Sequence, residues 1–288
     1  MNRVLSPSLQ APAATRPKAC PPICWLNVVC LDAPLVAIAW QALFAETFRV
    51  ELEGAMRAAL FLTAWLIYLA DRFADSLSLG QPARLSLRQE FCVRHRIGWL
   101  GLLAIVAATD AWVVVKYLDA AVFRLGVVCG LAAIAYLAIN ALSQLWRIIP
   151  LKEITIGSLF AAGVTLVPAA RGGDTKDHAL LACSVFAVVC ALNCMSIAAW
   201  ERELDSEQGK ASLGTWSPAL VRSVPIVCVV VGVAIAGLTP LAPRLFGALA
   251  VSAFFLAVLG TRAKALSTDT RTALADLAML TPLIAFRR

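Results

Sequence analysis

Long apolar windows, separated by short polar connections, follow one another through most of the chain. Each window is long enough, or nearly so, to cross the ~30 Å hydrocarbon core of a bilayer as a helix. The apolar residues are continuous and do not alternate with polar ones, which favours helices over the strands of a membrane barrel. We therefore predict nine membrane-spanning helices, at residues 23–45, 54–70, 97–115, 120–145, 154–170, 179–200, 224–241, 245–260 and 272–286.

The composition indicates the same class of protein. Hydrophobic residues make up 60% of the 288-residue chain and charged residues only 15%, and the mean hydropathy is +0.80. A soluble domain of this size could not expose so apolar a surface to water. The predicted fold class is therefore all-α, a polytopic membrane protein with one transmembrane helical domain at residues 23–288.

The first 22 residues differ from the rest of the chain. They contain five prolines among alanine and serine, and no apolar run of signal-peptide length precedes the first window. Such a composition cannot bury enough apolar surface to fold. We expect residues 1–22 to form a disordered tail on the cytoplasmic side.

The positive charges orient the helices. With the tail in the cytoplasm, 16 of the 25 lysines and arginines fall on cytoplasmic segments. This asymmetry is typical of proteins of the inner, cytoplasmic membrane, and it places the connections after the second and sixth helices in the cytoplasm. The net charge of +7 is then mainly topological. The sequence contains no basic cluster interleaved with aromatic residues, so we expect no nucleic-acid partner.

Two acidic motifs lie where an apolar window ends. Asp71 and Asp75 follow the second window, and Glu201 and Asp205 follow the sixth. Residues four apart share one face of a helix, and carboxylate oxygens are the ligands that Mg²⁺ prefers. Because one motif lies in each half, we interpret the chain as two four-helix units plus a ninth helix, with both motifs at the same membrane surface.

Basic and polar residues near the motifs are candidates for binding a phosphate group. Arg72 lies inside the first motif, Arg202 lies inside the second, and Arg147 and Lys152 lie on the connection between the two halves. Each can form charge-assisted hydrogen bonds with phosphate oxygens. Asn193, in the sixth window, would be costly if it faced lipid, so we expect it to line a cavity.

The arrangement of helices and acidic motifs resembles the UbiA superfamily of intramembrane prenyltransferases, over nearly the whole chain after residue 22. The first motif of that family usually reads Asn-Asp-x-x-Asp-x-x-x-Asp. Its last two acids match Asp71 and Asp75, whereas Ile67 and Tyr68 stand at the first two positions.

The second family motif, Asp-x-x-x-Asp-x-x-x-Asp, is matched by Glu201 and Asp205, and Gly209 stands at its third acid. The segment 136–162 resembles the stretch that brings a tyrosine and basic residues to the diphosphate. The chain therefore resembles a divergent, UbiA-like member.

The resemblance implies a transferase that moves an isoprenyl chain from a prenyl diphosphate to an acceptor, often an aromatic one. It implies catalytic and Mg²⁺-binding roles for Asp71, Asp75, Glu201 and Asp205. It implies diphosphate binding by Arg72, Arg147, Lys152 and Arg202. Release of diphosphate leaves about three negative charges, which metal ions and cationic side chains must neutralise.

Two other functions stay open at this point. One is a catalytically inactive UbiA-like protein that acts in transport or as an accessory membrane protein. The other is a membrane phosphotransferase of the CDP-alcohol type, although the Asp-Gly-x-x-Ala-Arg signature of that family is absent from the sequence.

Overall fold

The computed structural model describes residues 21–78, 84–142, 145, 151–171, 176–262 and 265–285. In these segments every regular element is a helix, as predicted. The helices are α1 (Cys24–Val28), α2 (Asp32–Thr47), α3 (Gly54–Ser78), α4 (Leu87–Arg94), α5 (Arg96–Tyr117), α6 (Ala120–Leu142), α8 (Lys152–Arg171), α9 (Lys176–Glu207), α10 (Leu213–Trp216), α11 (Pro218–Ala236), α12 (Pro243–Thr261), α13 (Thr268–Ala278) and α14 (Pro282–Ala285).

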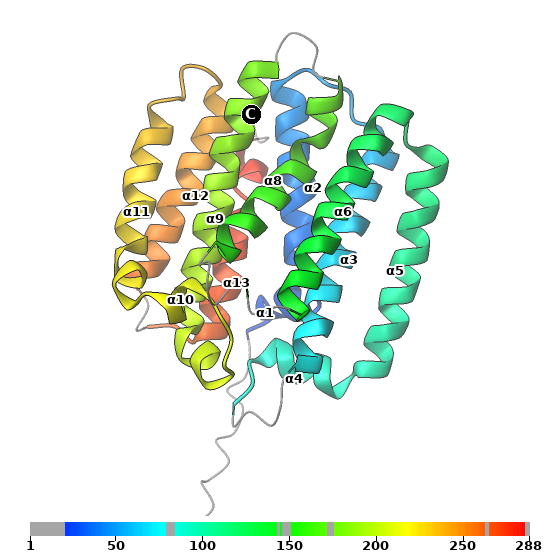
Figure 1. Ribbon diagram of the computed structural model, residues 1–288. Helices are drawn as coiled ribbons and strands as arrows, with labels where there is room; N and C mark the ends of the chain where they lie inside the picture. The colour runs from blue at the N-terminus through cyan, green and yellow to red at the C-terminus, as the bar shows by residue number, and fades with distance from the viewer. Residues whose placement is uncertain are drawn as a thin grey trace, which may run out of the picture.

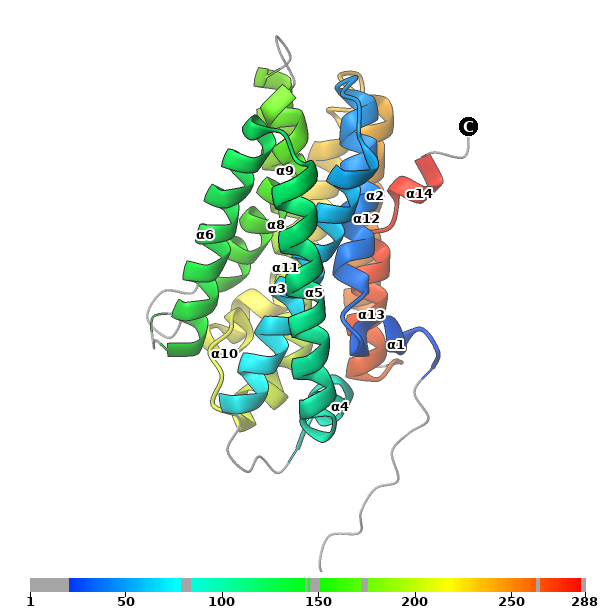
Figure 2. The same cartoon turned by 90° about the vertical axis from the view of Figure 1, so that its right-hand side faces the viewer.

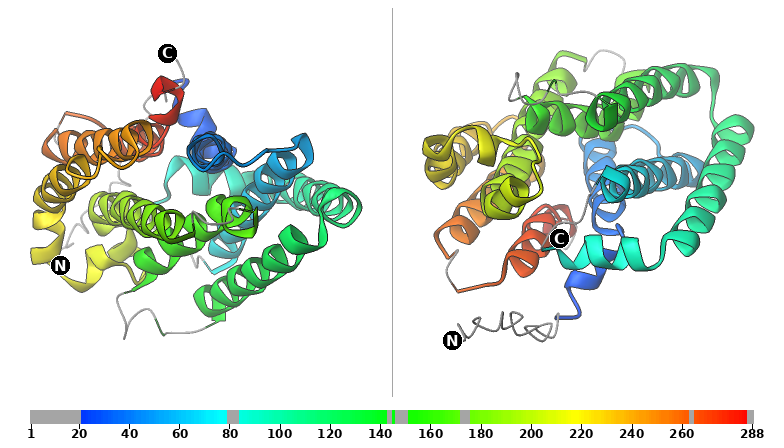
Figure 3. Two further views of the ribbon diagram at one scale, coloured as in Figure 1. Left: turned by 90° about the horizontal axis from the view of Figure 1, so that it is seen from above. Right: turned by 60° about the horizontal axis from the view of Figure 1, so that its bottom comes forward.

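The long helices lie side by side in a bundle, and the short helices α1, α4 and α10 gather at one end of it (Figures 1 and 2). Viewed from above, α2 and α9 lie toward the middle, and α5, α6 and α11 lie toward the outside (Figure 3). Large apolar side chains on these outer helices are exposed, among them Ile105, Leu131 and Val230. Lipid tails would cover such a surface.

Seven of the described helices are long and apolar enough to cross a membrane, namely α3, α5, α6, α8, α9, α11 and α12. They support an integral membrane protein. The predicted count of nine spans is not confirmed, because the first and last windows are interrupted.

Polar interactions account for both interruptions. The first window divides into α1 and the 16-residue α2. Between them Cys30 has a left-handed backbone (φ 58°), and the Asp32 carboxylate accepts the N–H of Ala33 at the start of α2. The ninth window divides into the 11-residue α13 and the four-residue α14. There Pro282, which has no backbone N–H to continue the ladder, begins α14, and the hydroxyl of Thr281 before it donates to the carbonyl of Ala248.

Both acidic motifs lie inside helices and not on connections after them. The apolar windows end at residues 70 and 200, but α3 continues to Ser78 and α9 to Glu207. Arginine, glutamate, alanine and leucine, which are good helix formers, accompany the aspartates there, and at a bundle end the charged side chains can face water or a polar cavity. The helical backbone therefore keeps each pair of acids on one helix face.

Aromatic packing holds α2, α9 and α13 together. The ring of Trp40 lies 4.8 Å from that of Phe186, centroid to centroid, and its indole N–H donates to the carbonyl of Met279 at 2.7 Å. Trp40, Phe44 and Phe186 have no exposed surface. This core fixes the helices whose lower ends carry the polar residues described below.

The helices α8 and α9 approach closely at Gly157. A Cβ atom on this residue would lie only 2.5 Å from the backbone nitrogen of Ala191. Because the clash is with backbone, a side-chain movement cannot relieve it.

We expect Gly157→Ala to destabilise the folded protein by roughly 1–3 kcal/mol, since α8 and α9 must separate. Thermal unfolding of the protein in lipid nanodiscs would measure the loss. Gly101→Ala on α5 is the matched control, because no atom lies within 4 Å of its added Cβ. Equal melting temperatures for the two variants would contradict the close approach.

Candidate active site

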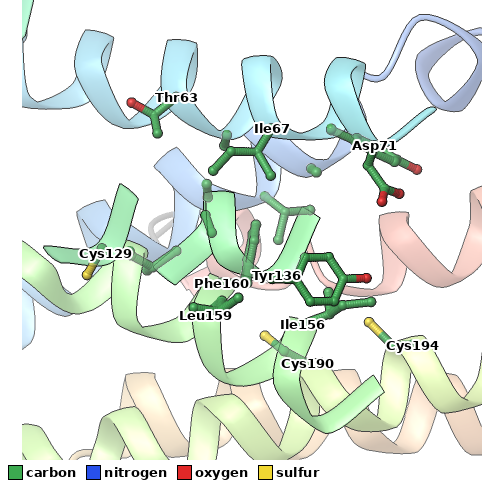
Figure 4. Close-up of a pocket in the computed structure, with 18 of the residues that line it drawn as sticks. Thr63, Ile67, Asp71, Cys129, Tyr136, Ile156, Leu159, Phe160, Cys190 and Cys194 are labelled. Carbon is green, nitrogen blue, oxygen red and sulfur yellow. The ribbon is translucent and has the colours of Figure 1, made fainter. Parts of the chain in front are cut away.

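An elongated cavity of about 580 Å³ lies between α2, α3, α6, α8, α9 and α13. Figure 4 shows Thr63, Ile67 and Asp71 along one wall on α3, across from Tyr136 and Phe160. The residues that α3 contributes extend from Met56 to Asp75. At 1.5 Å per helical residue the cavity therefore follows α3 for roughly 28 Å.

The cavity has a polar end and an apolar remainder. The four acids of the two motifs line its polar end together with lysine and arginine side chains. Toward the other end the wall is mainly aliphatic and aromatic, with Val36, Leu60, Phe160, Val164 and Val167. One compartment thus offers charged groups to a polar head and apolar walls to a hydrocarbon chain.

The structure brings Asp71, Asp75, Glu201 and Asp205 to this one cavity from two helices that are distant in sequence. Asp71 accepts a hydrogen bond from the side-chain amide of Asn140 at 3.1 Å. The positions agree with the sequence analysis, and the catalytic and metal-binding roles of these acids stay predictions.

Lys210 forms an ion pair with Asp75, with 2.7 Å between Nζ and Oδ2. Just after α9 ends, Gly209 takes the left-handed backbone (φ 65°) that often terminates helices. The chain turns there, and Lys210 comes to line the cavity beside the acids. Sequence reasoning missed this lysine, although a glycine and a lysine directly after an acidic helix end were a usable signal.

Arg88 forms a buried ion pair with Glu201. Its Nη2 lies 2.7 Å from Oε1 and 2.5 Å from Oε2, and the hydroxyl of Thr272 also donates to Oε1. The arginine is held by α4, which begins at a capping box formed by Ser86 and Gln89. Sequence reasoning treated Arg88 only as a topological charge, because no local pattern links it to a residue 113 positions away.

Asp269, at the start of α13, is also close to the Arg88 charge. Burial raises the pKa of this carboxyl, and the guanidinium acts in the opposite direction. A cation at this position therefore influences acids on more than one helix.

The structure separates the predicted phosphate-binding residues. Arg72, Lys152 and Asn193 line the cavity. Arg147 lies outside the described residues. Arg202 does not lie with the others: it is exposed and lines a separate pocket of about 480 Å³ with Trp200 and other residues.

The position of Arg202 follows from helix geometry. It comes directly after Glu201, and successive residues differ by about 100° around a helix. With Glu201 directed into the cavity, Arg202 must point elsewhere. Arg72 stays at the cavity because its guanidinium packs 4.9 Å from the ring centroid of Tyr68 and donates to the hydroxyl at 3.2 Å.

The acids fit Mg²⁺ only in part. Within the described segments, no three His, Cys, Asp or Glu side chains are grouped so that they could hold one ion. Both oxygens of Glu201 are engaged by Arg88, which weighs against the predicted role of Glu201 as a metal ligand. Asp71, Asp75 and Asp205 retain the right chemistry, since Mg²⁺ commonly takes one or two carboxylates and completes its shell with phosphate oxygens and water.

We expect Arg88→Met to destabilise the protein by roughly 3–5 kcal/mol, because Glu201 would be left charged and buried without its partner. The double variant Arg88→Met/Glu201→Met should recover much of that loss. The free energies of unfolding of the wild type, both single variants and the double variant form a double-mutant cycle. This cycle gives the coupling free energy between Arg88 and Glu201. Additive losses would show that the pair contributes nothing.

No family model matches the chain, and no curated protein matches it. Among solved structures, the chain is similar to the apo structure of a UbiA homolog from Aeropyrum pernix K1, with a TM-score of 0.59. The match covers 88% of this chain and 98% of the other, at 13% sequence identity. At this identity the likeness shows the fold alone, and the expected UbiA-like fold is confirmed.

Proposed function

We propose that this chain is an integral membrane prenyltransferase of the UbiA type, which transfers an isoprenyl chain from a prenyl diphosphate to an acceptor. One observation carries the proposal: the acids of α3 and α9 meet lysine and arginine at the polar end of a long cavity whose other walls are apolar. The UbiA-like fold supports it. A prenyl diphosphate has the same division into a charged head and a hydrocarbon tail.

The cationic side chains would bind the diphosphate directly. Arg72, Lys152 and Lys210 line the polar end, and each can pair with phosphate oxygens. Lys210 is paired with Asp75 in the ligand-free protein. When the diphosphate enters, Lys210 would turn to a phosphate oxygen, and Asp75 would exchange this contact for one with Mg²⁺.

Asp71, Asp75 and Asp205 would hold Mg²⁺ against the diphosphate. The bound metal would supply charge neutralisation for the leaving group. Arg88 would keep Glu201 fixed and neutralised, so that it does not repel the phosphates. We assign Glu201 this supporting part and not the metal-binding part that the motif resemblance implied.

The apolar part of the cavity would accept the isoprenyl tail. Residues from α2, α3, α6 and α8 form its wall, and water is largely excluded from such a surface. The aromatic rings of Tyr136 and Phe160 lie along the path from the polar end (Figure 4). Ring faces at this place can stabilise the positive charge that develops on the allylic carbon.

A second candidate function is supported by a specific observation. Two of the four acids already have cationic partners, Lys210 and Arg88. A UbiA-like protein that binds or moves an isoprenoid without reacting it, in transport or as an accessory protein, would need no metal and could keep these pairs permanently. We propose for either function that the acidic ends face the cytoplasm and that the protein lies in the inner, cytoplasmic membrane.

We expect the purified protein in nanodiscs to bind radiolabelled farnesyl diphosphate only when Mg²⁺ is present. Asp71→Asn and Asp205→Asn should each weaken binding at least about tenfold, because each removes a charged contact. Asp119→Asn is the control: this carboxylate pairs with Arg171 at the other end of the bundle and should leave binding unchanged. Equilibrium dialysis would measure all four proteins.

Two results would decide against the enzyme. Tight binding without Mg²⁺, or binding that Asp71→Asn and Asp205→Asn do not affect, would favour the accessory function. Incubation of the same sample with a membrane lipid extract, followed by mass analysis, would then look for prenyl conjugates. Their absence alongside intact recovery of the diphosphate would point the same way.

A further inference from the structure

One polar cluster of the bundle takes no part in the proposed diphosphate site. Asp32 begins α2 and Asp276 lies on α13. Near the lower end of the bundle in Figure 2, α13 contacts α1 and α2. The side-chain amide of Asn27 donates to the carboxyl groups of both aspartates. Two carboxyls that share one amide donor lie close together. Because two negative charges would repel each other there, the favoured state of the pair holds one proton and one negative charge.

Neutral amides, and not cations, complete the pair. The side-chain amide of Asn27 donates to Asp32 at 2.7 Å and to Asp276 at 3.1 Å. The amide of Asn193 donates to the other oxygen of Asp276 at 3.0 Å. Within the described segments neither aspartate forms an ion pair, in contrast to Asp75 and Glu201. The pair is therefore a hydrogen-bond acceptor with negative charge still available.

The pair faces the same cavity as the diphosphate site. Asp276 and Asn193 line the cavity, and so does Tyr68. The hydroxyl of Tyr68 accepts from Asn27 at 3.4 Å and from Arg72 at 3.2 Å. A continuous set of contacts thus connects the carboxyl pair with the first acidic motif.

Two further acceptors on this wall have no donor among the described residues. They are Oε1 of Gln41 and Oδ1 of Asn193, both buried atoms. Gln41 is only 1% exposed and lines the cavity from α2, next to Trp40, whose indole binds the carbonyl of Met279 on α13. A buried amide oxygen without a donor is costly, and a bound molecule that supplies a donor would remove that cost.

We infer that this wall of α2, α9 and α13 is the subsite for the acceptor substrate, and that the acceptor is an uncharged compound with hydroxyl or similar donors. The inference rests on the proposed prenyl transfer for its catalytic meaning. The predicted binding of such a compound to this wall does not depend on prenyl transfer. An anionic acceptor would be repelled by the carboxyl pair, whereas a hydroxyl group would donate to Asp276, and a second donor group would reach Gln41.

The same pair can take up the proton that the transfer releases. The carbon–oxygen bond of the prenyl diphosphate breaks with its electron pair going to the diphosphate. The acceptor oxygen forms the new bond to the allylic carbon, and its proton passes to the Asp32–Asp276 pair, which then holds two protons and no charge. Loss of such a base commonly costs about 10²- to 10⁴-fold in rate.

The test uses three small aromatic probes and the full-length protein in nanodiscs, with empty nanodiscs as the blank. 4-(2-Hydroxyethyl)phenol has a hydroxyl at each end, 4-ethylphenol has only the phenol, and 4-ethylbenzoate is an anion. We expect both phenols to bind saturably and 4-ethylbenzoate to bind at least about tenfold more weakly. Saturable benzoate binding as tight as that of the phenols, or no phenol binding, would overturn the inference.

Variants then assign the two ends. Asp276→Asn should weaken both phenols by about tenfold, because the charged acceptor is lost. Gln41→Leu should weaken only 4-(2-hydroxyethyl)phenol, by roughly fivefold, because one neutral hydrogen bond is lost. Equal effects of Gln41→Leu on the two phenols, or an unaffected Asp276→Asn, would contradict the assignment.

Ser252→Ala is the structural control. Its hydroxyl binds the carbonyl of Ala278 on α13 but does not touch the carboxyl pair, so phenol binding should stay at the wild-type level. If Ser252→Ala loses as much phenol affinity as Asp276→Asn, the carboxyl pair affects binding only through the packing of α13 and does not contact the phenol. Farnesyl diphosphate binding with Mg²⁺ is measured on each sample. If that binding is absent while the phenol pattern holds, the transferase proposal fails and the subsite stands.

Discussion

A carboxylate taken from water into an apolar helix bundle must be met by a cation or by hydrogen-bond donors, and the lower half of this structure is arranged around that requirement. Glu201 is met by Arg88, Asp75 by Lys210 and Asp71 by Asn140. Each partner comes from a different helix or connection. The acids therefore determine how the ends of α3, α4, α6 and α9 must come together, and they leave a polar compartment below an apolar one.

The two compartments give the protein its proposed chemistry. Charged groups that already have partners can exchange them for phosphate oxygens and a metal ion at little net cost, because one favourable contact replaces another. The apolar wall provides the larger part of the affinity for an isoprenyl tail, since burial of each CH₂ group contributes about 0.8 kcal/mol. The carboxyl pair on α2 and α13 adds a third side to the same cavity. Head, tail and acceptor would then meet in one place from which bulk water is excluded.

Much of this organisation could be predicted from the sequence, because it depends on local patterns. Continuous apolar windows gave the helices, and the four-residue spacing of Asp71 and Asp75 placed both on one helix face. The recurrence of an acidic pair in each half predicted that α3 and α9 bring their acids to one site, and both pairs line the same cavity. The cost of burying Asn193 correctly predicted a cavity-lining residue.

The remaining features depend on tertiary contacts that no local pattern carries. The partners of Glu201 and Asp75 are 113 and 135 positions away. Asp276 lies inside the predicted ninth window, and only the packing of α13 against α1 and α2 brings it to the Asn27 amide that it shares with Asp32. Arg202 is a different case, because its direction away from Glu201 follows from helix periodicity. Counting residues around the helix would have excluded Arg202 from the predicted diphosphate-binding residues.

The most direct test of this account is an experimental structure with Mg²⁺ and the thio analogue of farnesyl diphosphate, which resists cleavage. We expect the diphosphate between α3 and α9, in contact with Lys210 and the metal held by Asp71 and Asp205, with the tail along Val164. A diphosphate bound elsewhere, with the Lys210–Asp75 pair intact and the cavity empty, would contradict it.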